Sequence, residues 1–211
     1  MNRRTVMTLI ASISLLSGCF WDRYFNLSWE EEVQLHDGRI IVVKLTHTYE
    51  RLHREFGRYT SAVPRDTELS FDAGGETGRI TQLFKGGKPL ILDQHEGSWY
   101  LVLSVGPYRN SQLLPGQDWG PDQNGNGQHV ATLQGGNFKA VSICVLPDWF
   151  RKPNFLVRYS NADELSKFDG KLVTLRDTDA YLVNHPLLYG TAYIERPSAQ
   201  SDLACLNSKK K

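Results

Sequence analysis

Asp122, Asn124 and Asn126 place oxygen-bearing side chains at every second position of one short segment. The first half of a calcium-binding loop has this spacing, and a glycine such as Gly127 permits its sharp turn. The twelfth position of such a loop is normally a bidentate Glu, but here it is Leu133. Because Asp122 alone contributes a full negative charge, affinity for Ca²⁺ would be poor, and an Asn-Gly loop without a metal is the alternative. These three residues are the metal candidates, and we predict no cofactor.

Side chains suited to ligand binding occur within the Gly- and Pro-rich stretch 106–137, where regular alternation of apolar and polar residues is lost. They are Tyr108, Arg109, Trp119 and His129. Irregular connections of this length are uncommon and are often functional. An exposed aromatic ring there could stack on a sugar or anchor a peptide. The alternatives are that Tyr108 and Trp119 turn inward and fix the loop, or that the loop is a catalytic lid.

Sequence signatures of catalysis are absent. None of the six histidines forms a His-Glu-x-x-His pair, and the chain has no Gly-x-Ser-x-Gly, no phosphate-binding glycine motif and no Cys-x-x-Cys. Carboxylates such as Asp93, Glu96 and Asp118 are scattered. An enzyme is therefore the less favoured class. If the chain is a hydrolase, carboxylates or His129 would act as acid and base, with two such groups within about 10 Å in one pocket.

A β-hairpin is the clearest structural signal, because Asp37-Gly38 is a strong two-residue turn between apolar runs. With a two-residue turn, three pairs share one face, two of them apolar and one of opposite charge, namely Leu35 with Ile40, Val33 with Val42, and Glu31 with Lys44. The other face of the second strand carries Ile41, Val43 and Leu45. We therefore expect that strand to be buried on both faces.

Further short runs bounded by Gly or Pro predict strands spaced about ten residues apart. The expected strands are 68–72, 79–84, 89–93, 98–105, 138–146, 155–160, 171–176 and 187–195. A capping-box pattern at Asn161 and Glu164 predicts a short helix to Gly170, and 178–184 is expected to form a helical turn. Residues 47–59 fit either a helix or a continued strand. The sequence thus predicts a mainly β fold, an antiparallel sandwich or barrel-like sheet with one to three short helices.

The first nineteen residues have the order of a secretory signal, with a basic head at 2–4, an apolar run at 5–16 and small residues before Cys19. The ending Leu16-Ser17-Gly18-Cys19 resembles the lipobox of bacterial lipoproteins. That resemblance implies a diacylglyceryl group on the Cys19 thiol, cleavage before Cys19 and acylation, for example by palmitate, of the new amino terminus. Because Phe20 rather than Asp follows, the resemblance favours the periplasmic side of the outer membrane over the inner membrane. A plain cleaved signal is the alternative.

The predicted organisation is a lipoprotein signal peptide at 1–18, a lipidated tether at 19–28, one β-rich periplasmic domain at 29–206 and a basic tail at 207–211. Removing the signal leaves 22 basic and 23 acidic residues. A near-neutral balance argues against a nucleic-acid partner. The lipid is the only membrane anchor that the sequence implies, since no other apolar stretch reaches spanning length.

Cys144 and Cys205 remain as a pair once Cys19 carries a lipid. In an oxidising compartment we expect them to form a disulfide that ties the C-terminal segment to the domain, with a buried Cys144 and a free Cys205 as the alternative. On the chain-entropy model this bridge is worth at most about 4 kcal/mol.

Residues 29–43 resemble the opening of a group of proteobacterial lipoproteins to which no activity is assigned. They match the form Trp-x-Glu-Glu-Val-x-Leu-x-Asp-Gly-Arg, and the resemblance implies no function. The function expected from the sequence is a non-catalytic binding or interaction domain, held at the membrane by a lipid, with an envelope protein or glycan as partner. The alternatives are an envelope hydrolase acting on glycan or peptide and an immunity-type inhibitor of an envelope toxin.

Overall fold

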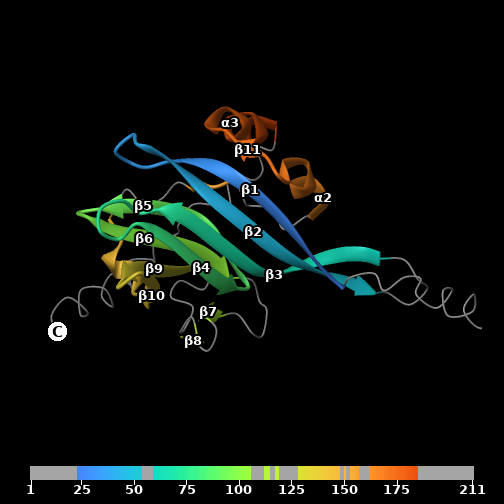
Figure 1. The fold of residues 1–211 in the computed structure, drawn as a ribbon, viewed down its shortest axis with the longest axis horizontal. Helices are drawn as coiled ribbons and strands as arrows, with labels where there is room; N and C mark the ends of the chain where they lie inside the picture. Colours follow the sequence, from blue (N-terminus) through green and yellow to red (C-terminus); the bar gives the residue numbers. More distant parts are fainter. Residues whose placement is uncertain are drawn as a thin grey trace, which may run out of the picture.

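A computed structural model of the chain describes residues 23–53, 59–105, 112–114, 117–118, 128–147, 150, 153–156 and 162–184. Within these ranges the chain is mainly β and forms two sheets (Figure 1). The sandwich-like architecture expected from the sequence is confirmed, with a few short helices added.

The larger sheet has seven strands in the order β11-β1-β2-β3-β4-β7-β8. Their bounds are β1 Tyr24–Gln34, β2 Ile40–His53, β3 Tyr59–Asp72, β4 Arg79–Lys85, β7 Gln112–Leu114, β8 Gln117–Asp118 and β11 Leu172–Val173. All neighbours are antiparallel except β11, which runs parallel to β1. Figure 1 shows that β1, β2 and β3 extend well beyond the rest of the molecule at one end.

The smaller sheet has four strands in the order β10-β9-β6-β5. Its members are β5 Gly87–His95, β6 Ser98–Val105, β9 Gln128–Gln134 and β10 Asn137–Val141. The main core contains buried side chains from both sheets, including Trp29 and Leu45 from the larger sheet and Leu92 and Leu101 from the smaller one. Burial of this apolar surface is the main driving force that holds the two layers together.

Helical turns follow the strands. They are η1 Ile143–Val145, α2 Ala162–Leu165, η2 Ser166–Phe168 and α3 Leu175–Asn184. The predicted helix before Gly170 is therefore present as α2 and η2, whereas the predicted strand 171–176 is wrong beyond the two residues of β11. Thr174 and Asp177 form a reciprocal capping box that starts α3 instead. In the described ranges, no helix has the length and apolar character needed to span a bilayer.

The β1–β2 hairpin is present, but its predicted register is wrong by one residue. The Leu35 amide donates to the Arg39 carbonyl (2.8 Å), so three residues rather than two form the loop, with Gly38 at a φ of 87°. Gln34 therefore pairs with Ile40 and Glu31 with Val43. A one-residue slip moves every side chain of a strand to the other face.

The corrected register changes which residues are buried. The core face of β1 carries Leu27, Trp29, Glu31 and Val33, all buried. The second strand was expected to be buried on both faces, but Ile40 and Val42 are about half exposed, so its outer face meets solvent.

Several further boundaries differ from expectation, among them the start of β3 at Tyr59 instead of residue 68. Strand β9 lies inside the stretch 106–137. We expected no regular structure there, because Gln, His and Thr interrupt the apolar pattern of this strand. The predicted strand 138–146 ends at Val141 and continues as η1. Strand β1 begins at Tyr24, so residues 24–28, expected in the tether, belong to the sheet. Residues 47–53 continue β2, which excludes the helical alternative there.

Candidate functional site

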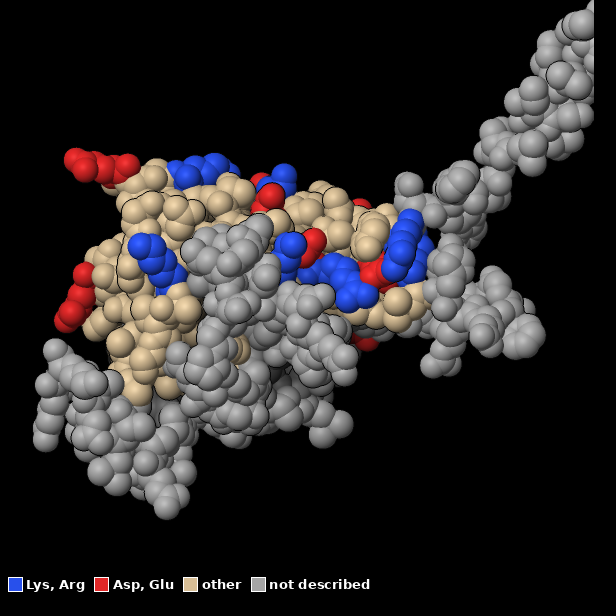
Figure 2. Space-filling model, turned by 90° about the horizontal axis from the view of Figure 1, so that it is seen from below, with Lys and Arg blue, Asp and Glu red and all other residues tan. Residues whose placement is uncertain are grey.

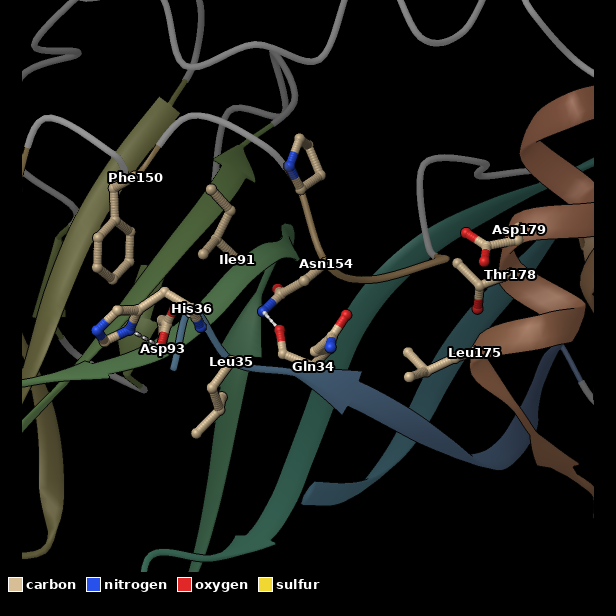
Figure 3. Close-up of a pocket in the computed structure, with 11 residues that line it drawn as sticks. Gln34, Leu35, His36, Ile91, Asp93, Phe150, Asn154, Leu175, Thr178 and Asp179 are labelled. Carbon is tan, nitrogen blue, oxygen red and sulfur yellow. Dashed lines mark hydrogen bonds and ion pairs between the residues drawn. The ribbon is translucent and has the colours of Figure 1, made fainter. Parts of the chain in front are cut away.

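A pocket of about 290 Å³ lies where the β1–β2 loop, β5, α3 and the residues Phe150, Pro153 and Asn154 meet (Figure 3). Its lining combines apolar and polar side chains, namely Gln34, Leu35, His36, Ile91, Asp93, Phe150, Pro153, Asn154, Leu175, Thr178 and Asp179. Small-molecule sites typically show this mixture of apolar walls and a few polar groups, and this volume is at the small end of their range.

His36 and Asp93 form the most ordered polar pair in the pocket. Asp93 is buried, and its Oδ1 lies 2.9 Å from the His36 Nδ1, while its Oδ2 accepts the His36 backbone amide at 3.0 Å. A carboxylate in this position keeps the proton of the neutral ring on Nδ1, so Nε2 is the basic nitrogen. The pair therefore has the arrangement of an oriented acid–base group.

Asn154 holds the two sheets together beside this pair. Its side-chain amide donates to the Leu92 carbonyl (2.8 Å) and to the Gln34 carbonyl (3.1 Å), and its Oδ1 accepts the Leu92 amide (3.1 Å). Figure 3 shows the Asn154 amide between Gln34 and the strand that carries Ile91 and Asp93. One side chain thus fixes the end of β1 against the edge of β5.

Helix α3 supplies the opposite wall (Figure 3). The Leu175 amide at its first turn donates to Glu32 Oε2 (3.0 Å), which docks the helix on β1. Thr178 is only 9% exposed, and its Oγ1 has no hydrogen-bond partner. A buried hydroxyl without a partner is costly, so Thr178 is a natural contact for a ligand that can hydrogen-bond to it. Asp179 adds a carboxylate on the same wall.

Behind the pocket, Glu31 is completely buried in the core. Its Oε1 accepts the Leu156 amide and its Oε2 accepts the Trp29 indole N–H (3.2 Å). Burial raises the pKa of Glu31 to about 7, although both hydrogen bonds oppose the increase. Because Leu156 follows Asn154 closely, Glu31 also helps to hold the segment that forms one side of the pocket.

His47, on the neighbouring strand β2, is also completely buried. Its ring stacks on Trp29, with centroids 5.1 Å apart, and its Nε2 has no hydrogen-bond partner. Burial and, to a lesser extent, the charge of Lys88 lower the pKa of His47 to about 3. Burial likewise lowers the pKa of Lys88 to about 8. Glu31, His47 and Lys88 therefore have pKa values far from their ordinary values, although none of the three lines the pocket.

Most of the binding and metal residues predicted from the sequence are not placed by the structure. Tyr108, Arg109 and Trp119 lie outside the described residues, as do the metal candidates Asp122, Asn124 and Asn126. His129 is described, but it is buried in β9 opposite Leu103 and does not line the pocket. Over the described ranges, no three His, Cys, Asp or Glu side chains are grouped to hold a metal ion.

The predicted lipid site and disulfide lie largely outside the described ranges. Cys19 and Cys205 both fall there, so lipidation and the bridge stay predictions. Cys144 lies in η1, and it is not free.

The pocket residues were missed because no local pattern connects them. Asp93 was considered only as one of several scattered carboxylates, and it lies 57 residues from His36. The expected helical turn 178–184 is confirmed within α3 and did place Thr178 and Asp179 on a helix, but it gave no sign that they meet His36 and Asp93.

No protein-family model, no curated protein and no solved structure matches the chain.

Proposed function

We propose that the chain is a lipid-anchored protein of the cell envelope that acts as a non-catalytic binding domain. The lipobox ending at Cys19 supports the anchor. The pocket beside His36 and Asp93 supports the binding role, and it replaces the 106–137 loop as the site that we would test first.

The ligand class follows from the pocket lining. The Asp179 carboxylate, the Gln34 amide and the unpartnered Thr178 hydroxyl provide hydrogen-bonding groups, while no Lys or Arg of the described chain lines the pocket. Phe150, Ile91 and Pro153 add apolar walls. A small, hydroxyl- or amine-bearing ligand fits these walls, and in the envelope a single sugar or a short piece of cell-wall peptide has this chemistry.

The binding role is tested by calorimetric titration of the protein with soluble cell-wall sugars and peptides. We expect Thr178→Val to weaken binding by about tenfold, because it removes one hydrogen-bonding group while keeping the shape of the side chain. Thr48→Val, on the outer face of β2 and remote from the pocket, is the matched control and should bind like the unchanged protein. If Thr178→Val and Asp179→Asn both bind normally, the pocket is not the site.

The anchor is tested separately by the mass of the mature protein. Lipidation predicts an acylated N-terminal peptide beginning at Cys19, and Cys19→Ala should abolish both this mass and membrane association. An unchanged mass and distribution would contradict the lipoprotein assignment.

A disulfide between Cys144 and Cys205 is the remaining part of the proposal. Two observations support it. Cys144 has an interaction partner, and lipidation of Cys19 leaves two cysteines that can pair with each other. Under non-reducing conditions, peptide mapping should recover the two cysteines in one linked fragment. Recovery of both cysteines as free thiols would contradict the proposed disulfide.

An envelope hydrolase is the second candidate, and the His36–Asp93 pair is the observation that favours it. In that case His36 would activate a water molecule and Asp93 would hold the ring in position. Release of soluble fragments from purified cell wall, lost in His36→Gln, would support this candidate. Binding without any release would leave the non-catalytic role.

A further inference from the structure

The end of the larger sheet where β1 begins carries an unusual group of exposed side chains. We call this end the arm and define it by Arg23, Tyr24, Arg51, Leu52 and Arg65. The backbone places these residues together, since Tyr24 pairs with Glu50 and the Arg51 amide donates to the Arg23 carbonyl (2.8 Å). Figure 2 shows Lys and Arg side chains along the described surface seen from below, with Asp and Glu side chains between some of them.

The arm has a net positive charge. Arg23 and Arg65 both form ion pairs with the single carboxylate of Glu50, and hydrogen bonding, first of all from Arg23, holds the pKa of Glu50 below its usual value. The two guanidinium side chains stay accessible, at 70% and 40% exposure. Arg51 adds a third positive charge, stacked over the Phe25 ring at 4.3 Å. Three arginines and the one carboxylate of Glu50 thus give these four described residues a formal charge of +2.

Apolar groups accompany these charges. Tyr24 is half exposed, with the Arg23 guanidinium 5.7 Å from its ring centroid, and Leu52 is 37% exposed. Arginine, tyrosine and leucine side chains together suit the boundary between lipid headgroups and acyl chains. A purely aqueous surface gives no comparable reason to expose them side by side.

We propose that the arm lies against an anionic phospholipid surface when the protein is anchored. The inference rests on the proposed lipidation of Cys19, because only three residues lie between Cys19 and Arg23, and the four residue steps span at most about 14 Å. This short tether lets the arginines approach the bilayer to within the screening length of about 8 Å in physiological salt, where they feel the surface charge.

Docking of the arm would orient the whole domain. His36 lies beyond the opposite end of β1, and the ten residue steps from Tyr24 to Gln34 extend about 33 Å. The pocket would therefore face away from the bilayer, where soluble or cell-wall ligands can reach it.

The orientation can be measured with the acylated full-length product in vesicles that contain headgroup-labelled quencher lipid. Fluorophores are attached in turn at Leu52→Cys on the arm and at Ile40→Cys, which is exposed at the far end of the same strand. In phosphatidylglycerol-rich vesicles we expect strong quenching at position 52 and little at position 40. Labelled parent chain corrects for reaction at the native cysteines.

Charge dependence separates headgroup attraction from simple tethering. The quenching at position 52 should decrease in pure phosphatidylcholine vesicles and at high salt. Arg51→Gln should lower the ratio of docked to undocked arm about fivefold. Lys44→Gln removes one positive charge from the middle of the same strand and should leave the ratio unchanged.

The possible failures are distinguishable. The arm proposal alone is overturned if an acylated, vesicle-bound chain is quenched equally at both positions. It is also overturned if the quenching at position 52 does not change with the charge of the vesicles. A mature protein without acyl mass on Cys19 overturns the anchor and, with it, the orientation.

Discussion

The buried carboxyl of Glu31 should make the stability of the protein depend on pH in an unusual direction. Its pKa in the folded chain is about 7, against an ordinary value of 4.5. Below pH 4.5 the carboxyl is protonated in both the folded and the unfolded chain. As the pH rises toward 7, the unfolded chain releases this proton while the folded chain keeps it, so the free energy of unfolding decreases.

The magnitude follows from the two pKa values. A separation of about 2.5 in pKa corresponds to about 3 kcal/mol, most of which is gained on lowering the pH from about 7.5 to 5. Other groups titrate in this range, and the contribution of Glu31 is isolated by comparison with Glu31→Gln, which cannot ionise. Relative to this variant, the unchanged protein should become more stable as the pH falls.

Urea-induced unfolding at about pH 5 and pH 7.5, followed by tryptophan fluorescence, measures the difference. Glu30→Gln, on the solvent-facing side of the same strand, is the matched control and should show no such pH-dependent difference. If Glu31→Gln folds poorly, Glu31→Leu provides a second uncharged variant. A difference that is equal at both pH values, or that has the opposite sign, would refute the burial argument.

Burial lowers the pKa of His47 from 6.5 to about 3. The free energy of unfolding should therefore decrease as the pH falls below 6.5, because the unfolded chain then binds a proton that the folded chain does not. Relative to His47→Gln, urea unfolding should show a decrease of about 2.5 kcal/mol between about pH 7 and 4.5. Asn154→Ala removes three hydrogen bonds and should lower the free energy of unfolding by about 2 kcal/mol or more, whereas Asn137→Ala, whose bond is long and exposed, should change it by less than about 0.5 kcal/mol. Glu96 has a φ of 49° in the two-residue turn between β5 and β6, so Glu96→Asn should raise the thermal midpoint, with a gain of about 0.5–1 kcal/mol; a lower midpoint would contradict this reasoning.

Strands were predictable where alternation is regular and glycine marks the ends. The expected strand 98–105 coincides with β6, and the expected strand 79–84 differs from β4 by one residue. The register of the first hairpin was not predictable, because Asp37-Gly38 fits a two-residue loop as well as the three-residue loop that forms. With that choice Glu31 pairs with Val43 instead of the expected Lys44, and its carboxyl is completely buried in the core.

The pocket was still less accessible to sequence reasoning. Its walls come from four separate parts of the chain, and contacts such as that between Asn154 and Gln34 join residues 120 positions apart. Local patterns report periodicity within one element, whereas the pocket depends on how elements pack. Local patterns predicted the first hairpin, the strand 89–93 and the helical turn 178–184, but none of them indicated that these elements meet.

The contacts of Asn154 have a consequence for the protein at high concentration. Strand β5 is the last strand of its sheet, and an unpaired last strand can recruit a strand from another molecule. Asn154 occupies this edge with its backbone amide on the Leu90 carbonyl and its side chain on both polar groups of Leu92. One asparagine thus imitates the missing neighbour strand, and it protects the protein at high concentration from joining edge to edge with other copies.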